Sequence, residues 1–286
     1  MINKRICSEI IPHYVEIRDN SQRITFIENL RLSDKKVEWI TLCNPYKGEG
    51  LNHYSTTADG RNILEDPQEL RNTFLVLVNK SREIINRLSL MDILVREQSG
   101  NPISLKGNEV DISSSYIMRS DPQNSSVGKT IILLFGISTN KTKEELCQIQ
   151  KTAFLDYIGI KFPDSVSGYR DFYFPDQQSF KNRKLISMSL VNCDVTPDLY
   201  NNAFAFQAEN YSDLPLVTLV DVRGKLVTDH LPITCLTEFS QMGNQVFYND
   251  FLFDGVEIDW ARSFLSTTNA TGNSEFFFNL MLTKNW

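Results

Sequence analysis

The chain has 286 residues, enough for one or two domains, because single hydrophobic cores stop growing at about 250–300 residues. Its 41% hydrophobic and 22% charged residues are typical of a globular protein that buries a substantial core. The 29 basic and 35 acidic residues leave a net charge of -6 without any cluster of lysines or arginines, which argues against a nucleic-acid-binding protein.

Two further patterns predict synthesis and folding in a cytoplasm. No apolar run approaches the ~20 residues that a membrane-spanning helix needs, and residues 1–13 lack the apolar core of a signal peptide. The cysteines are single, scattered and odd in number, which predicts free thiols in a reducing compartment. They are Cys7, Cys43, Cys147, Cys193 and Cys235.

In chain order, residues 1–22 come first, and Pro12 there argues against a long helix, so an extended N-terminal arm is expected. Strands are predicted at 23–27 and 37–42 from their alternating apolar residues. Residues 44–72 contain several glycines and prolines but few large apolar residues. This composition predicts a long excursion from the core, and long loops in compact domains usually have a function.

The rest of the first module consists of short apolar segments that predict strands. They lie at 74–78, 84–95, 109–117 and 129–137. After them, Thr142 to Glu145 fits a helix capping box, and apolar residues at helical spacing predict a connecting helix over 142–158. Residues 161–182 contain two prolines and several aromatic residues and are predicted to be an irregular lead into the second module.

The second module is predicted to open with residues 185–190, in the role that 24–30 have in the first module. Further short strands separated by turn signals follow, with little helix between them. Parallel βαβ winding would need a helix between successive strands, so the pattern indicates antiparallel sandwiches or jelly rolls.

An internal repeat supports two modules. Glu109–Ile117 recurs as Glu257–Leu265, 148 positions later (257 − 109), in the pattern E-[VI]-D-[IW]-x-x-S-[YF]-[IL]. Two looser matches flank it, 77–79 with 219–221 at an offset of 142, and 128–135 with 272–279 at an offset of 144. These offsets are close to half the chain length, which indicates that the chain contains two copies of one module.

The predicted fold is therefore all-β, with two tandem jelly rolls joined by a short helix. Its parts are an N-terminal arm (1–22), a first jelly roll (23–140), a helical connection and lead-in (141–182) and a second jelly roll (183–286).

The sequence predicts no catalytic, cofactor-binding or metal-binding residue, and an enzyme is not expected. Val127–Thr130 resembles the end of a phosphate-binding loop, but Gln123 stands where that motif needs a glycine, so a turn into a strand is favoured. His13, His53 and His230 are far apart, and His230 is interpreted as a strand-end residue. The motifs G-x-S-x-G, C-x-x-C and H-E-x-x-H do not occur.

The repeated acids allow two interpretations. The pairs Glu109/Asp111 and Glu257/Asp259 each fall on one face of a strand and could ligate Ca²⁺, act as acid and base, or process a glycoside. Alternatively, the apolar residues between and after them face the core, and the acids face solvent or a neighbouring subunit. The second interpretation is favoured because nothing near either pair supplies a second catalytic group in both copies.

The paired E-[VI]-D blocks, with the apolar strands that follow them, make residues 23–286 resemble the double jelly-roll major capsid proteins of tailless icosahedral phages with an internal membrane. The resemblance implies a structural virion protein, made in the host cytoplasm, whose trimers form pseudo-hexameric capsomers in an icosahedral shell. It implies neighbouring capsomers and penton or spike proteins as partners, outer loops at 44–72 or 200–212, and an arm at 1–22 that reaches the membrane or a neighbour.

The alternative from another class is a tandem β-sandwich that binds carbohydrate, as a lectin-like or spike protein. Such a protein needs exposed aromatic side chains, and Tyr169, Phe172, Tyr173 and Phe174 are the candidates. Packing of the same side chains against a barrel is the competing interpretation.

Overall fold

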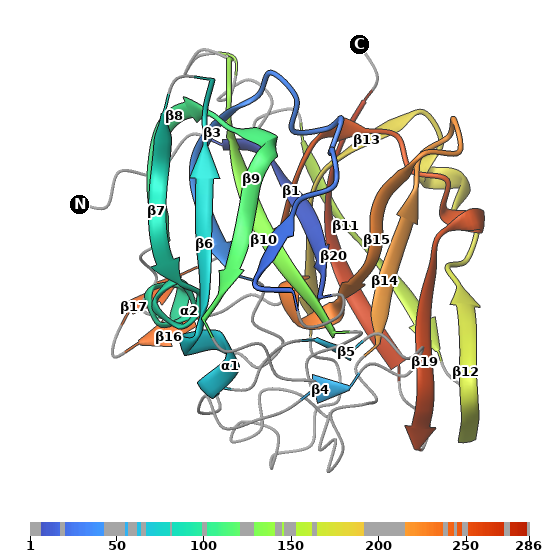
Figure 1. The fold of residues 1–286 in the computed structure, drawn as a ribbon. Coiled ribbons are helices and arrows are strands. Elements are labelled where there is room, and N and C mark those ends of the chain that lie inside the picture. The colour runs from blue at the N-terminus through green and yellow to red at the C-terminus, as the bar shows by residue number, and fades with distance from the viewer. Residues whose placement is uncertain are drawn as a thin grey trace. The chain divides into compact units, whose positions relative to one another are not determined.

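The computed structural model of the chain is nearly all β, which confirms the predicted class (Figure 1). It describes residues 7–17, 21–42, 55–56, 62–63, 67–80, 82–98, 102–120, 129–140, 145, 153–161, 165–191, 215–236, 240–242, 245–247, 251–271 and 275–284. These residues form two compact units, the first ending at residue 140 and the second beginning at residue 145.

Unit 1 consists of two antiparallel four-stranded sheets with small additions. In the first sheet, β10 (Lys129–Ser138) lies between β1 (Cys7–Glu16) and β3 (Lys36–Leu42), and β8 (Ile103–Glu109) follows β3. The second sheet has the order β2 (Arg23–Thr25), β9 (Asp111–Arg119), β6 (Thr73–Val78) and β7 (Glu83–Ser89). The additions are β4 (Ser55–Thr56), β5 (Asn62–Ile63), which also pairs with β10, and the helices α1 (Pro67–Arg71) and α2 (Leu90–Gln98).

The core of unit 1 lies between its two sheets. Alternate residues of β10 and β3, such as Leu133, Phe135 and Ile40, pack in one cluster with Leu75 of β6 and Ile117 of β9. All five are fully buried, as a sheet with one face on the core requires. Helix α2 adds its own buried side chains, among them Leu90 and Ile93, to the same cluster.

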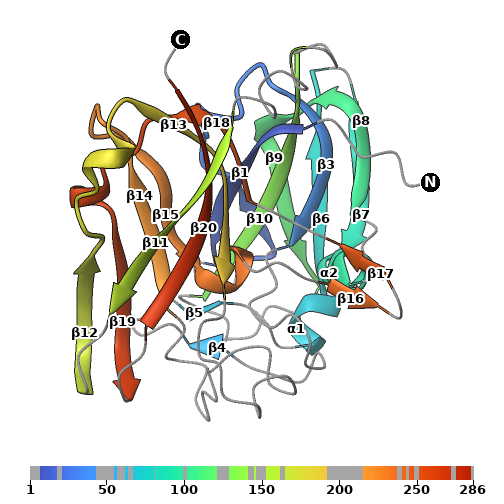
Figure 2. The ribbon, with the colours of Figure 1, turned by 180° about the vertical axis from the view of Figure 1, so that it is seen from behind.

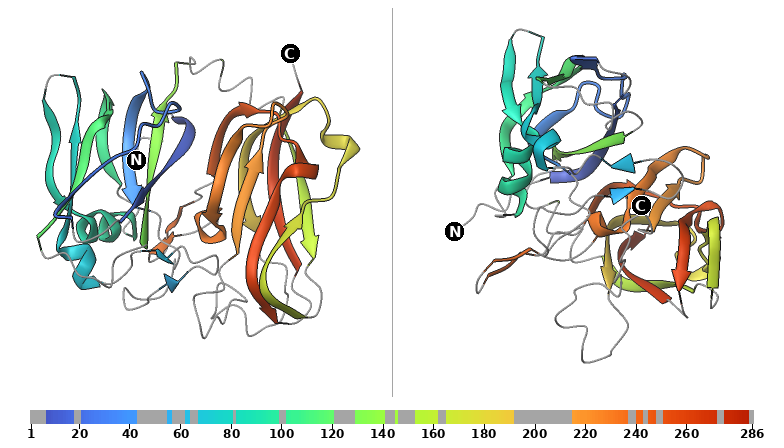
Figure 3. Two further views of the ribbon diagram at one scale, coloured as in Figure 1. Left: turned by 45° about the vertical axis from the view of Figure 1, so that its right-hand side comes forward. Right: turned by 60° about the horizontal axis from the view of Figure 1, so that its bottom comes forward.

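Unit 2 repeats this plan. Its first sheet has the order β11 (Phe154–Lys161), β20 (Glu275–Lys284), β13 (Arg183–Val191) and β18 (Phe251–Val256), seen in front in Figure 2. Its second sheet has the order β12 (Ser165–Tyr173), β19 (Phe264–Thr271), β14 (Leu216–Val220) and β15 (Leu226–Pro232). In each unit the two sheets lie face to face, as the right-hand view of Figure 3 shows.

Three 3₁₀ turns and one separate hairpin complete unit 2 as described. The turns are η2 (Gln178–Phe180), η5 (Ile233–Leu236) and η6 (Trp260–Arg262), and the hairpin pairs β16 (Ser240–Met242) with β17 (Gln245–Phe247). Between the sheets, Phe174 stacks edge-on against Trp260 and Phe278, with ring centroids 5.7 Å and 5.6 Å away. Large aromatic side chains thus fill the core of this unit.

A shared irregularity sets the residue-by-residue correspondence of the units. Opposite Gly136 and Ile137, strand β3 carries one extra residue, Glu38, between the paired Trp39 and Val37. Opposite Met281 and Leu282, strand β13 carries the extra residue Ile186 between Ser187 and Leu185. A β-bulge is a specific local feature, so its recurrence at the same place in the same pair of strands supports duplication of the module.

The bulge corrects two parts of the predicted repeat. Strand β13 is equivalent to β3, so residues 185–190 do not have the role of 24–30. Phe135 pairs with Ile40 and Leu280 with Met188, so the closing strands correspond at an offset of 145 (280 − 135) and not 144. The error of one residue matters because it moves every side chain to the opposite face of the sheet.

The predicted arm is also wrong over residues 7–16. Cys7–Glu16 is strand β1, paired with β10 from Cys7 opposite Ser138 to Glu16 opposite Thr130. Pro12 is compatible with this position because β1 pairs with β10 alone among the described strands, and an edge strand can leave one N–H position unused.

The predicted connection and lead-in are wrong where the structure describes them. Residues 154–158 belong to strand β11 and not to a helix, and Ser165–Tyr173 is strand β12 and not an irregular segment. Glu145 is helical, and the rest of 141–152 lies outside the described residues. Unit 2 therefore draws two of its eight principal strands from the segment that was predicted to precede it.

Candidate functional site

The repeated acidic blocks form the same junction in both units, between the last strand of the first sheet and the second sheet. In unit 1 the junction joins β8 to β9, and in unit 2 it joins β18 to β19. The apolar residues of the two blocks, Val110, Ile112, Ile258 and Trp260, are all less than a tenth exposed. This agrees with the favoured interpretation, in which these side chains face the core.

The aspartate of each block caps the turn at its own junction. Asp111 accepts hydrogen bonds from the Ser113 and Ser114 hydroxyls (2.7 and 2.8 Å) and from the Ser114 N–H (3.1 Å). Asp259 accepts from the Arg262 N–H (3.2 Å) and forms an ion pair with the Arg262 guanidinium. The two serine hydroxyls are the main reason why the pKa of Asp111 lies below its ordinary value.

A buried serine completes each junction. Ser115 Oγ donates to the Asp111 carbonyl (2.6 Å) and accepts from the Val78 N–H (3.1 Å). In unit 2, Ser263 Oγ donates to the Asp259 carbonyl (2.8 Å) and accepts from the Val220 N–H (3.0 Å). Because neither serine is exposed, each hydroxyl satisfies two backbone groups that water does not reach.

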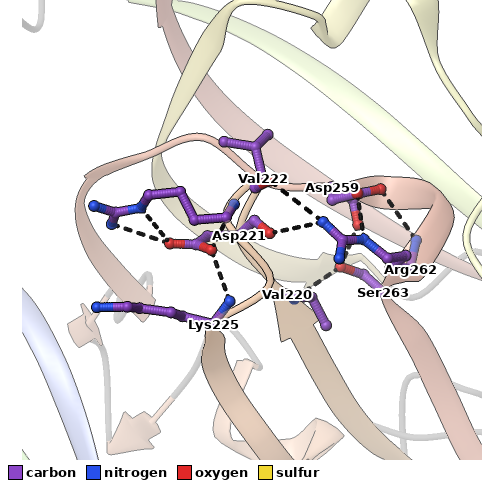
Figure 4. Close-up of polar contacts among 8 residues, drawn as sticks. Val220, Asp221, Val222, Lys225, Asp259, Arg262 and Ser263 are labelled. Atoms are coloured by element: carbon purple, nitrogen blue, oxygen red, sulfur yellow. Dashed lines mark hydrogen bonds and ion pairs between the residues drawn. The ribbon is translucent and has the colours of Figure 1, made fainter.

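In unit 2 a second aspartate, Asp221, organises the β14–β15 turn, and Arg262 connects the junction to this turn (Figure 4). Asp221 Oδ1 accepts from the N–H groups of Arg223 (2.9 Å) and Lys225 (2.8 Å). From the junction, the Arg262 guanidinium donates to the carbonyls of Val222 (3.3 Å) and Asp221 (3.4 Å). Gly224 supplies the positive φ of 83° that the turn requires.

The electrostatics of Asp221 fit this structural role. Burial raises the pKa of its carboxyl group, but the Lys225 and Arg223 N–H groups and the Arg223 guanidinium lower it by more, so the pKa lies below its ordinary value. The carboxylate is thus held ionised by groups of the turn itself.

The four repeated acids do not form a common centre within either unit. Glu109 is an exposed partner of Lys80 at 3.9 Å, while Glu257 accepts from the Asn182 N–H at 3.1 Å. Among the described residues, no group of three histidine, cysteine, aspartate or glutamate side chains could hold a metal ion. Since both aspartates are engaged by their own turns, the geometry favours a structural role for the acids over the Ca²⁺ or acid–base alternatives.

The two described histidines, His13 and His230, have different surroundings. His13 of β1 is buried in unit 1, 5.0 Å from the Phe26 ring and 3.4 Å from the Asn29 amide nitrogen. Burial lowers its pKa to about 4. His53, like residues 127 and 128 of the phosphate-loop-like stretch, lies outside the described residues.

His230 is part of a polar cluster that the sequence did not predict. Its Nε2 lies 3.1 Å from the Tyr169 hydroxyl, which donates to Ser266 Oγ (3.0 Å), and Ser266 Oγ donates to Asp171 (2.7 Å). His230 Nδ1 also contacts the carboxylate of Asp229. The cluster draws on β12, β15 and β19, so no short sequence motif could have revealed it.

We call this surface the tyrosine face of unit 2. It comprises Tyr169, Asp171, Tyr173, His230, Phe264 and Ser266. Of the four aromatic candidates from the sequence, Tyr169 and Tyr173 are 42% and 58% exposed, Phe172 is half-buried and Phe174 is buried in the core. The face is therefore the one described surface where predicted aromatic candidates reach solvent.

One prediction about the cysteines is wrong. Cys235 of η5 is disulfide-bonded, where a free thiol was expected, and its partner lies outside the residues whose side chains the structure describes. The structure therefore contains at least one disulfide bond.

No family model, curated protein or solved structure matches the chain. None of the described helices is both long and apolar enough to span a bilayer.

Proposed function

We propose that the chain is a double jelly-roll capsid protein that assembles through trimers into an icosahedral shell. The observation on which this rests is that both units have the same strand order. With the principal strands of each unit counted from one to eight, the sheets of both read 1-8-3-6 and 2-7-4-5.

That order supports a jelly roll in each unit. It results when a long antiparallel hairpin with the strand pairs 1 and 8, 2 and 7, 3 and 6, and 4 and 5 is rolled into two facing sheets. In unit 1 these pairs are β1 with β10, β2 with β9, β3 with β8, and β6 with β7. Unit 2 has the corresponding four pairs.

Two similar barrels in one chain suit a protein that tiles a surface. A closed trimer of such chains presents six barrels, so its outline approaches sixfold symmetry although its true symmetry is threefold. Each chain can carry different loops on its two barrels. The segments proposed as outer loops, 44–72 and 200–212, lie largely or wholly outside the described residues, and only β4, β5, α1 and Asn72 are described within them.

The proposed partners follow from the same function. They are two further copies in the trimer, neighbouring capsomers, penton or spike proteins, and an internal membrane. Strand β1 places residues 7–16 of the proposed arm in a sheet, and residues 1–6 lie outside the described residues. The proposed location is the virion, after synthesis in a host cytoplasm.

Size-exclusion chromatography with light scattering, followed by electron microscopy, tests this function. A trimer has three times the chain mass of 32.9 kDa, about 99 kDa, and micrographs are expected to show pseudo-hexagonal particles or closed shells. A chain that stays monomeric at every concentration and forms no particles contradicts the proposal.

A carbohydrate-binding function is the second candidate, and the exposure of Tyr169 and Tyr173 on one strand favours it. Exposed aromatic rings stack on apolar faces of sugars while neighbouring polar groups bind hydroxyls. Glycan-array binding that is lost in Tyr173→Ala, with a monomeric chain in solution, would favour this function over the capsid proposal.

A further inference from the structure

The second sheets of the two units carry opposite charges at one pair of equivalent positions. Phe26 donates its N–H to the Ser115 carbonyl in unit 1, and Phe174 donates its N–H to the Ser263 carbonyl in unit 2, which fixes the offset between β2 and β12 at 148 (174 − 26). Arg23 of β2 is therefore equivalent to Asp171 of β12 (171 − 23). Both side chains are exposed.

The outer surface of the unit 1 sheet is basic and apolar, and we call it the basic face. It comprises Arg23, Phe74, Arg87, Tyr116 and Met118. The Arg23 guanidinium lies over the Tyr116 ring, 3.7 Å from its centroid. Phe74, Tyr116 and Met118 are half-buried, so an apolar strip lies between the two arginines.

Arg87 lies at the far side of this face from Arg23. Leu75 pairs with Leu88, as Val217 pairs with Leu231, so Arg87 is equivalent to His230. Both residues lie at a bulge and have positive φ, 55° for Arg87 and 47° for His230. The only acidic residue of β7, Glu83, pairs with Val78 at the other end of the strand, beside the turn to β6.

The tyrosine face of unit 2 has the complementary character. Its carboxylate is that of Asp171, and the Asp229 side chain, which is 38% exposed and contacts His230 Nδ1, lies beside the face. Arg170 is also exposed, but it alternates with Asp171 along β12 and therefore projects toward the other side of the sheet. The basic face thus presents arginines at both edges, with Tyr116 on the strand beside Arg23. The tyrosine face presents Asp171 at one edge, with Asp229 beside the other edge and Phe264 on the strand next to Asp171.

We infer that the basic face of one copy docks on the tyrosine face of another copy. Docking like on like would place Arg23 near arginines or Asp171 near carboxylates, whereas docking of unlike faces brings opposite charges together and buries the aromatic strips. Because the two faces differ, the contact is heterologous, and repetition around an axis closes a ring. This inference rests on the proposed function and names the surfaces that its trimer uses.

Charge reversal in the full chain tests the inference. Arg23→Asp and Asp171→Arg are each expected to weaken self-association about tenfold or more, measured by sedimentation equilibrium, because each places like charges in the contact. The double variant, with both reversals, is expected to restore association to within a few-fold of the unchanged chain.

Two controls separate lost charge from lost structure. Lys161→Asp makes the same charge change as Arg23→Asp at an exposed residue of β11, in the other sheet of unit 2, and is expected to leave association unchanged. Asp171→Asn removes the charge but keeps an oxygen that accepts from Ser266, so weaker association in this variant reports charge and not a broken cluster.

The outcomes also separate this inference from the proposed function. If the unchanged chain forms trimers and neither reversal affects them, or if the double variant fails to recover, the docking of these two faces is wrong while the capsid proposal stands. If the unchanged chain is monomeric at every concentration, both fail.

Discussion

Ser115 and Ser263 make the same pair of hydrogen bonds in two different units. Each hydroxyl bridges the carbonyl of the aspartate four residues before it and the N–H of a valine on the neighbouring strand, Val78 or Val220. Neither serine is exposed to solvent. In the most recognisable part of the sequence repeat, a buried serine hydroxyl therefore provides hydrogen-bond partners to two backbone groups.

Replacing either serine by alanine is expected to lower the free energy of unfolding by about 1–3 kcal/mol, because a buried N–H and a carbonyl each lose their partner. Calorimetry or urea titration measures the loss. Ser113→Ala is the matched control, since Ser113 is exposed and bonds only a neighbouring carboxylate, and it is expected to change stability by less than about 0.5 kcal/mol. Equal effects at Ser113 and Ser115 would contradict this role.

The repeated blocks could be found in the sequence because their residue types are the same in both copies. The prediction of one strand in each block was wrong, because each block joins two strands of different sheets. The tyrosine face could not be found in the sequence, because its equivalents differ in chemistry. Asp171 corresponds to Arg23, His230 to Arg87, and Ser266 to Met118 at the offset of 148 (266 − 118). A surface assembled from three strands, with different residues in each copy, leaves no repeat and no short motif.

Two of the errors in the fold have identifiable physical sources. Phe154 and Ile158 are four residues apart, a spacing that fits both a helix face and one face of a strand, so the pattern did not distinguish them. All residues from Ile131 to Ile137, apart from Gly136, are large and apolar, and all seven are buried. Such a run has no alternation to fix its register, which is why the closing strands were aligned one residue out.

His13 is expected to make unit 1 sensitive to mild acid. Its pKa is about 4 in the folded chain against an ordinary value of 6.5, so the unfolded chain takes up the proton first as the pH falls. Stability is unaffected above pH 6.5 and is lost between pH 6.5 and about 4, by about 3 kcal/mol in all at 1.36 kcal/mol per unit.

Urea titrations at pH 7.5 and pH 4.5 measure this loss. His13→Phe keeps a planar ring beside Phe26 and Phe135 but cannot take up a proton, so its stability is expected to change less between the two pH values. An identical loss in the variant and in the unchanged chain would exclude His13 as the cause.

Gly136 of β10 is expected to tolerate no side chain, because a Cβ there would overlap the Trp39 indole. Gly136→Ala should lower the free energy of unfolding by about 1–3 kcal/mol through overpacking. Gly159→Ala in β11 is the matched comparison, since its Cβ would meet the Phe277 ring at 2.9 Å, a milder overlap at the same kind of close approach. Thermal unfolding of both variants tests whether Gly136→Ala lowers stability more than Gly159→Ala does. A larger loss of stability in Gly159→Ala would contradict this prediction.

Asp221 is expected to stabilise the β14–β15 turn through its oxygens more than through its charge. Asp221→Ala removes the acceptor of the Arg223 and Lys225 N–H groups and should cost about 2 kcal/mol. Asp221→Asn keeps one acceptor oxygen and should cost less. It introduces the side chain that unit 1 has at Asn79, which accepts from the Arg82 N–H at 2.9 Å.

The pH dependence of these variants separates the two contributions. Because the pKa of Asp221 is lowered from 3.8 on folding, the stability that its charge provides is present above pH 3.8 and is lost as the pH falls below that value. The difference in unfolding free energy between the unchanged chain and Asp221→Asn is therefore expected to shrink below pH 3.8. A difference that stays constant down to pH 2 would show that the charge contributes nothing to the turn.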